Sequence, residues 1–427
     1  MSQEARVKSQ PLIRFGELAA YKSFMYLLLA RIISRFGDSI DSIAYSWMVY
    51  RLTGSTLMMG TLFALNFIPN IAFSFFAGTL VDRWSKKKVA AFTYLGRGLI
   101  VCFTAFLYWQ GWLAPWHLYV LTFLTSTLEC FASPAELALV PQLLPKEKLL
   151  SGNSFSTSAS RAAELAGMAA VGGIIATLGI STAILIDGIT FTLAAGFIFM
   201  IRTPRPSTNP ASPAPHLTDT QPDDSFVQEL KAGLKYLISN KLLITIVMAA
   251  AFVNFCLSPF NVLNAVYVDE ILGSGPAGLS LMGISLICGT IVSGLWIGKK
   301  GSAYKKSRLI LTGYLLLGAN YALMYLPAVV PIQPLALAAL FSFGMGISVS
   351  LCNTPTTTYF MESVPKELLG RVGALYSMVC TCAIPAGSAL AGVVGEWMPV
   401  HLLYVSFGCL LLIPLLFLLK QRSFMEI

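Results

Sequence analysis

Four ionisable residues and a tyrosine lie within one long apolar segment near the start of the chain: Arg31, Arg35, Asp38, Asp41 and Tyr45. In a helix, Arg31, Arg35 and Asp38 share a face because they are spaced i, i+4, i+7, and Asp41 and Tyr45 extend that face obliquely. A carboxylate beside a guanidinium in a dry environment can ionise, and protonation of the acid loosens the pair. The segment therefore predicts a proton-coupling or substrate-contacting site. The structural alternative is a permanent Arg35–Asp38 ion pair that orients helices.

Further ionisable residues lie within other apolar segments. Glu129 has no basic partner at helical spacing, and Asp187 lies near the outer part of its segment. Because a charge in a bilayer is costly, intramembrane acids are candidates for functional sites, and we include both in the predicted cavity. Arg161 and Glu164 are spaced i, i+3, which predicts an ion pair with a functional or a purely structural role. Glu136 is expected to reach the inner interface.

The second half of the chain carries neutral polar residues at comparable depth. Asn254, Asn261 and Asn264 lie in one apolar segment, and Asn261 corresponds to Asp41 at the repeat offset described below. We expect the first half to handle protons and the second half to supply neutral substrate contacts. The alternative is that these asparagines form hydrogen bonds between helices, as polar residues in membrane bundles often do.

The composition indicates which elements position these residues. The chain has 427 residues, of which 56% are hydrophobic and 11% charged, and its mean hydropathy is +0.71. Soluble chains are usually about 25% charged, so a single soluble domain is excluded, and so is intrinsic disorder. The eight cysteines lie in apolar runs without metal-site spacing. We expect no metal site and no cofactor.

The apolar runs are long and continuous, which predicts an all-α membrane protein and excludes a β-barrel with its alternating pattern. Twelve spans are expected, in two sets of six that form two six-helix halves. They are 23–50, 56–80, 89–110, 116–140, 153–178 and 182–201, then 242–270, 277–298, 309–328, 333–355, 372–396 and 399–420.

The segments outside the two halves are short. We expect a cytoplasmic N-terminal segment at 1–22 and a cytoplasmic tail at 421–427, with the helical bundles at 23–201 and 242–420. Residues 202–241 form a predicted cytoplasmic linker, rich in Pro, Ser, Thr and Asp at its start. Phe226, Leu230, Leu234 and Leu237 then recur at helical spacing, which predicts an amphipathic helix on the inner membrane surface.

The basic residues define a topology. Lys and Arg gather in alternate loops, such as Lys86–Lys88 and Lys305–Arg308, whereas Arg51 is the one basic residue expected outside. This asymmetry places both termini in the cytoplasm of a multi-pass protein of the cytoplasmic (inner) membrane. The net charge of +9 is explained by that topology, so no nucleic-acid partner is expected. We expect no cleavable signal peptide, since the first residues are charged and lack an early apolar core.

The two halves share landmarks. Pro145-Lys146-Glu147 recurs as Pro365-Lys366-Glu367 at an offset of 220 residues, and Gly78 recurs as Gly298 at the same offset (365 − 145 and 298 − 78). Both matches fall on predicted inner loops after an even-numbered span. Parallel six-helix repeats of this kind place a substrate cavity between the halves near the bilayer midplane.

The loop Gly78-Thr79-Leu80-Val81-Asp82-Arg83-Trp84-Ser85-Lys86-Lys87-Lys88 resembles the signature loop G-x-x-x-D-R-x-x-R-[KR] of the major facilitator superfamily. The resemblance implies the fold of twelve helices in two halves. It also implies a conformational gate formed by Gly78, Asp82, Arg83, Gly370 and Arg371, in which Asp82 meets the inner start of the eleventh span near Gly370 and Arg371 in the outward-open state. A carboxylate suits such a helix N-terminus.

Within that superfamily the chain is similar to the third drug–proton antiporter group, which includes macrolide-efflux-like and enterobactin-exporter-like proteins. The residues that carry this similarity are Arg35-Phe36-Gly37-Asp38, Thr53-Gly54-Ser55, Pro134-Ala135, Asn153-Ser154, Ile186-Asp187 and Gly370-Arg371-Val372.

The expected function is secondary active transport: proton-coupled efflux of an amphipathic small molecule, such as a drug or siderophore, by alternating access. No phosphate-binding G-x-x-x-x-G-K-[ST] loop and no nucleophile–base pattern occurs in the sequence, so ATP drive and enzymatic activity are not expected. The expected partners are a small-molecule substrate, protons and the lipid bilayer, and we expect a monomer. The alternatives are a lipid, lysolipid or solute transporter of the same fold, or a non-transporting receptor or sensor.

Overall fold

A computed structural model describes residues 18, 20–145, 148–202, 231, 233–330, 333–365 and 368–426. Within these residues the regular structure is helical, which confirms the expected all-α membrane fold. The first half contains α2 (Lys22–Thr53), α3 (Thr56–Leu65), α4 (Ile68–Arg83), α5 (Lys86–Trp109), α6 (Pro115–Leu143) and α7 (Leu149–Met200).

The second half repeats this arrangement after the linker. It contains α9 (Lys241–Glu270), α10 (Gly275–Lys300), the 3₁₀ turn η2 (Gly301–Ala303), α11 (Lys306–Leu323), α12 (Leu326–Val329), α13 (Pro334–Ser363), α14 (Leu369–Gly395), α15 (Val400–Leu410), α16 (Leu412–Leu419) and α17 (Arg422–Met425).

Each of the twelve predicted spans coincides with a helix or a pair of consecutive helices. Nine helical segments of the described residues are long and apolar enough to cross a membrane. One of these, Ser151–Met200, contains two predicted spans, because the backbone leaves the helical conformation at Gly179 (φ 83°, ψ 168°). The helices α2 and α6 complete the set at 32 and 29 residues. They fall outside the nine because their polar and charged residues lower the local hydropathy.

Some helices extend beyond the predicted boundaries. The tenth span was expected to end at residue 355, but α13 continues to Ser363 with Pro355 inside it. The prediction follows where the apolar run ends, whereas a helix can continue into the polar interface because its backbone bonds are internal. Pro134 likewise lies inside a helix, α6.

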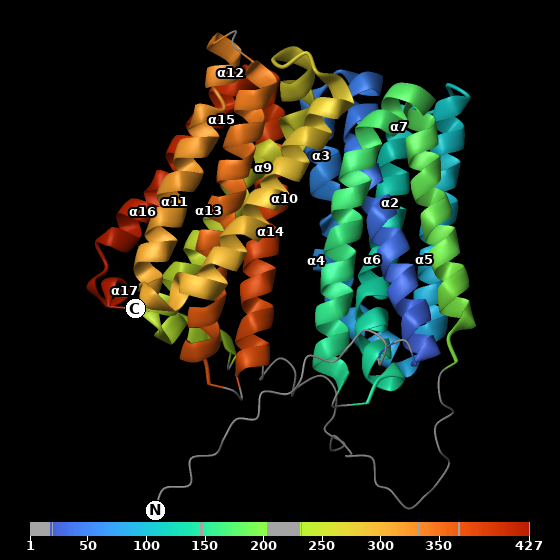
Figure 1. Ribbon diagram of the computed structural model, residues 1–427, viewed down its shortest axis with the longest axis horizontal. Coiled ribbons are helices and arrows are strands. Elements are labelled where there is room, and N and C mark those ends of the chain that lie inside the picture. Colours follow the sequence, from blue (N-terminus) through green and yellow to red (C-terminus); the bar gives the residue numbers. More distant parts are fainter. Residues whose placement is uncertain are drawn as a thin grey trace, which may run out of the picture.

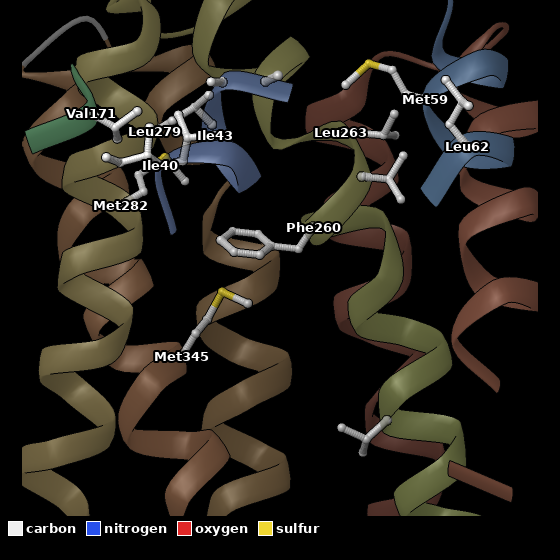
Figure 2. Close-up of a cluster of buried hydrophobic side chains, with 14 of the residues drawn as sticks. Ile40, Ile43, Met59, Leu62, Val171, Phe260, Leu263, Leu279, Met282 and Met345 are labelled. Carbon is white, nitrogen blue, oxygen red and sulfur yellow. The ribbon is translucent and has the colours of Figure 1, made fainter. Parts of the chain in front are cut away.

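The helices form two bundles that stand side by side (Figure 1). The ribbons of α2–α7 and of α9–α16 approach each other at the end that holds α12 and separate towards the opposite end. At the close end the contact is apolar: Ile40, Ile43 and Val171 of the first half lie beside Leu279 and Met282 of α10 (Figure 2). This burial holds the bundles together at one end.

A second contact between the halves is the crossing of α3 and α14, which we call the α3–α14 crossing. A Cβ atom placed on Gly60 would lie 2.4 Å from the carbonyl oxygen of Ser388 and 2.8 Å from Gly392 Cα. The two backbones are therefore almost in contact, and glycine is required at this point. The Thr56 hydroxyl donates to Gly392 O at 3.0 Å.

The crossing ends in a carboxylate clamp at the start of α3. Glu396, which follows α14, accepts hydrogen bonds from the backbone N–H of Leu57 at 3.0 Å and from the hydroxyls of Ser55 at 2.8 Å and Thr56 at 3.2 Å. These bonds, led by that from Leu57, lower the pKa of the Glu396 carboxyl below its ordinary value. A negative side chain at a helix N-terminus is favourable, so the clamp joins the halves at their close end.

Most of the linker and of its predicted amphipathic helix lies outside the described residues, including Phe226 and Leu230. In the described part, Leu237 is buried and the Tyr236 hydroxyl donates to Ser363 O at 2.8 Å. This stretch packs one face against the second half, while Leu234 and Ile238 are exposed. The helix on the membrane surface stays a prediction.

Candidate functional site

A cavity of about 420 Å³ lies within the first half, between α2, α5, α6 and α7, and we call it the charged cavity. Four arginines and four carboxylates line it: Arg31, Arg35, Arg97, Arg161, Asp38, Glu129, Glu136 and Glu164. Several of these residues come from spans that are far apart in the sequence. Because opposite charges are present in equal number, the fold can hold them in apolar surroundings as ion pairs.

Arg97 of α5 is the centre of the largest pairing. Its Nη2 lies 3.3 Å from Asp38 Oδ1 and 3.7 Å from Glu129 Oε2, and its guanidinium lies 4.1 Å from the centre of the Phe191 ring. Asp38 also lies 3.7 Å from Arg35. Thus the main partner of Asp38 is Arg97, which the sequence analysis did not place in the site.

A second pairing lies beside it. Arg31 Nε donates to Glu136 Oε2 at 2.9 Å and Arg31 Nη1 donates to Ser156 Oγ at 3.2 Å. The Tyr94 hydroxyl donates to the other oxygen of Glu136. Glu136 is therefore held inside the bundle, and the expectation that it reaches the inner interface is wrong. Glu129 has no basic partner at helical spacing, as expected, but Arg97 approaches it from another helix.

Asp41, Tyr45 and Asp187 lie further along the same helices. Asp41 and Tyr45 line a small cavity of about 90 Å³ together with Thr104 and Thr122, and the Tyr45 hydroxyl is 2.5 Å from Thr122 Oγ1. Among the described residues, Asp41 has no basic group within ion-pair distance. Asp187 is 1% exposed and accepts a hydrogen bond from Thr190 Oγ1 at 3.3 Å. These acids lie within a bundle that also holds Arg97.

A larger cavity, of about 560 Å³, lies between the two halves, and we call it the central cavity. Its wall is amphipathic: apolar side chains such as Phe63, Met168 and Phe260 alternate with the amides of Asn261 and Asn264. Asn261 and Asn264 thus reach the predicted substrate cavity. Cavities of this size and mixed lining typically bind small molecules.

Arg161 and Glu164 of α7 line the central cavity and the charged cavity at once. Arg161 Nη1 donates to Glu164 Oε2 at 2.7 Å, which is the ion pair expected from their spacing. The two cavities are therefore neighbours that share these two side chains.

Asn254 lies elsewhere. It lines a neutral cavity of about 390 Å³ inside the second half, and its side-chain amide donates to Cys380 O at 3.2 Å. This bond joins α9 to α14, which matches the alternative that the sequence analysis left open for the asparagines.

The predicted gate residues are described only in part. Gly78, Asp82 and Arg83 lie in α4 and Gly370 lies in α14, but the contacts of these residues fall outside the described side chains. Arg371 is described as half-buried in α14. The pairing of Asp82 with the start of the eleventh span remains a prediction.

Sequence reasoning missed Arg97 and Tyr94 as members of the site. A signal for Arg97 was present, because an arginine inside an apolar span and flanked by Gly96 and Gly98 requires a buried partner. In the described part of the chain, no cluster of three or more His, Cys, Asp or Glu side chains is arranged to hold a metal ion.

Comparison with known proteins gives matches over nearly the whole length. The sequence model described as "Major Facilitator Superfamily" matches residues 27–388. The chain is 24% identical over 392 residues to "Macrolide efflux protein A" of Streptococcus pyogenes, covering 91% of this chain and 93% of that protein. It is 26% identical over 426 residues to "Enterobactin exporter EntS" of Escherichia coli O1:K1 / APEC, covering 98% and 97%.

Solved structures show the same fold. The nucleoside transporter NupG superposes with a TM-score of 0.70 at 12% identity, covering 95% of this chain and 98% of that one. A bacterial homolog of the human lysosomal transporter Spinster, in an inward-facing and unoccupied conformation, superposes with a TM-score of 0.68 at 11% identity, covering 95% and 96%.

Proposed function

Because the chain belongs to the Major Facilitator Superfamily, we propose that it is a proton-coupled exporter of an amphipathic small molecule that works by alternating access. The observation that carries this proposal is the contact between two cavities. The amphipathic central cavity and the charged cavity share Arg161 and Glu164, so a bound molecule lies beside a network of acids and arginines. The relatives named for macrolide efflux and enterobactin export support outward transport of a small molecule.

In this proposal the α3–α14 crossing and the clamp at Glu396 close the outer end. The opposite end is, in this proposal, the one that opens inward, since the ribbons of the two bundles lie further apart there (Figure 1). Rocking of one bundle against the other would open the outer end around the fixed central cavity, as in transporters built from two repeated halves.

The orientation follows from the basic residues. Two spans separate the start of α5 at Lys86 from the start of α2 at Lys22, so both lie on one side of the membrane. Six spans precede the second half, so α9 also begins on that side. Two further spans then bring the start of α11 at Lys306 back to it. The positive-inside rule places that side in the cytoplasm. We therefore propose a protein of the cytoplasmic (inner) membrane with both termini inside and a monomer as the working unit.

The coupling step assigns roles to the acids of the first half. With Asp38 ionised, it pairs with Arg97 and Arg35 and holds α2 against α5. Protonation removes the negative charge, weakens both pairs and lets the helices shift. Asp41, which lies one turn further along α2, provides a second proton position. Each proton taken up from outside and released inside would drive one reorientation of the bundles.

Transport in proteoliposomes with an imposed pH gradient tests this function. A macrolide, enterobactin and an amphipathic dye are the probes, and wild type is compared with D38N and D41N. The matched control is E426Q, an exposed acid at the end of the chain. We expect gradient-driven accumulation of at least one probe by wild type and E426Q and its loss in D38N. Unchanged accumulation in both D38N and D41N would refute the coupling role, and gradient-independent flux would refute proton drive.

A further inference from the structure

The charged side chains that line the central cavity lie on one helix, α7. Of the described residues that line this cavity, Arg161 and Glu164 are the ionisable ones, and the rest are apolar, hydroxyl or amide side chains. A molecule in this cavity therefore meets charge at one place on α7. If Arg161 contacts the molecule, the cavity favours an anion, and if Glu164 contacts it, the cavity favours a cation.

The exposure of the two side chains is unequal. The Arg161 side chain is 66% exposed and the Glu164 side chain is 25% exposed. The guanidinium of Arg161 is thus the more accessible of the two charged groups, and Arg161 lines both cavities. Among the described contacts the guanidinium forms one hydrogen bond, from Nη1 to Glu164. Its other N–H groups, which form a planar fork suited to a carboxylate, are available to a ligand.

The existing pair is weak enough for a ligand to compete with Glu164. Ion pairs between exposed side chains of one helix add little stability, and the Arg161 side chain is 66% exposed. A guanidinium can also hold two carboxylates, so a ligand can join the pair without displacing Glu164.

The neighbouring carboxylates do not oppose an anion at this position. Asp38 and Glu129 lie against Arg97, and Glu136 lies against Arg31. Arginines and carboxylates line the charged cavity in equal number, so its formal charge is zero. An anion that binds Arg161 therefore meets carboxylates whose negative charges are already paired with arginines.

We propose that Arg161 is the anion subsite of the central cavity and that the substrate is an amphipathic organic acid. Its negatively charged group binds the guanidinium of Arg161, and its apolar body lies against Phe63, Met168 and Phe260. The amides of Asn261 and Asn264 offer neutral hydrogen bonds along the same wall. This assignment rests on the proposed function, since it names the class of the exported molecule.

Equilibrium binding to the full chain in lipid nanodiscs tests the subsite without any gradient. The probes are 11-(dansylamino)undecanoic acid, its neutral primary amide and the amine of matched length, each titrated by dansyl fluorescence. Wild type is expected to bind the acid about tenfold more tightly than the amide, the change that one charge-assisted contact supplies. R161Q is expected to lose that preference while its affinity for the amide changes by less than about twofold.

Two further variants separate charge from folding. R161K keeps the positive charge and is expected to retain part of the preference for the acid, and E164Q is expected to strengthen acid binding because the guanidinium is released. The matched control is R51Q, which removes an arginine that stacks on Trp47 away from both cavities.

The assignment is overturned if wild type binds the acid no better than the amide, or if R161Q weakens both equally. It is equally overturned if the amine is preferred and E164Q abolishes its binding. A preserved acid preference in a protein that shows no gradient-driven transport refutes the proposed function and leaves the subsite standing, so the two failures are distinct.

Discussion

The α3–α14 crossing predicts that the G60A substitution shifts the protein towards an outward-open state. The added Cβ would lie 2.4 Å from Ser388 O, 2.8 Å from Gly392 Cα and 2.9 Å from Gly392 N. Ordinary carbon–oxygen contacts are about 3.3 to 3.6 Å, so the backbones have to separate by roughly 1 Å. Neither backbone can rotate away as a flexible side chain would.

The cost falls on one state only. Overpacking of this kind costs about 1 to 3 kcal/mol, and the crossing exists only while the halves are in contact. The helix-forming advantage of alanine over glycine is the same in both states and cancels. The ratio of outward-open to closed molecules should therefore rise by about 5- to 150-fold.

The assay is labelling from outside with a membrane-impermeant maleimide in right-side-out vesicles. The reporter is S46C, because Ser46 lines the central cavity, and mass spectrometry of its peptide separates it from the eight native cysteines. The matched control is G173A in α7, where an added Cβ meets nothing within 4 Å. If G60A and G173A label at the same rate, the crossing does not hold the outer end closed and the reasoning fails.

Two other substitutions test the ion pairs and the clamp. R97Q leaves Asp38 and Glu129 without their shared partner, although these two side chains are 30% and 56% exposed. Loss of a hydrogen-bonded charged partner costs about 1 to 3 kcal/mol, so the thermal melting temperature in detergent should fall for R97Q. It should recover partly in R97Q with D38N and stay unchanged in R51Q. Equal melting of R97Q and wild type would contradict the pairing. E396Q should increase outside labelling of S46C by weakening the clamp at α3. The pKa of Glu396 is lower in the closed state than its ordinary value, so the ionised carboxylate stabilises the clamp at neutral pH. This contribution is lost as the outside pH falls through the acidic range, so outside labelling of S46C in the otherwise wild-type protein should rise on acidification. A rise of the same size in E396Q would assign the pH dependence to another group.

The fold could be predicted from the sequence because the bilayer imposes a simple rule. Twelve apolar runs of sufficient length, a repeat at a constant offset and one-sided basic loops are all local or periodic features. Where the prediction failed, as at the end of α13, the helix continues beyond the apolar layer that hydropathy detects.

The site could be predicted only in part, because pairings between helices depend on how the helices are rotated. Spacing within α7 gave the Arg161–Glu164 pair correctly. Spacing within α2 pointed to Arg35 as the partner of Asp38, whereas the shorter contact comes from Arg97 on α5. The partners of Glu129 and Glu136 could not be predicted for the same reason, because Arg97 and Arg31 lie on other helices. The division of the asparagines between the central cavity and a helix contact also depends on tertiary packing.

Exchange of protons for an amphipathic molecule requires that the two fluxes be coupled, so both are measured in the same vesicles. Proteoliposomes holding a pH-sensitive dye are loaded with 11-(dansylamino)undecanoic acid, and its efflux is followed without an imposed pH gradient, with the passive flux of protein-free liposomes subtracted. We expect that substrate leaving in one direction moves protons in the other, and that D38N abolishes the proton movement. Substrate efflux through the wild-type protein with no accompanying proton movement would contradict it.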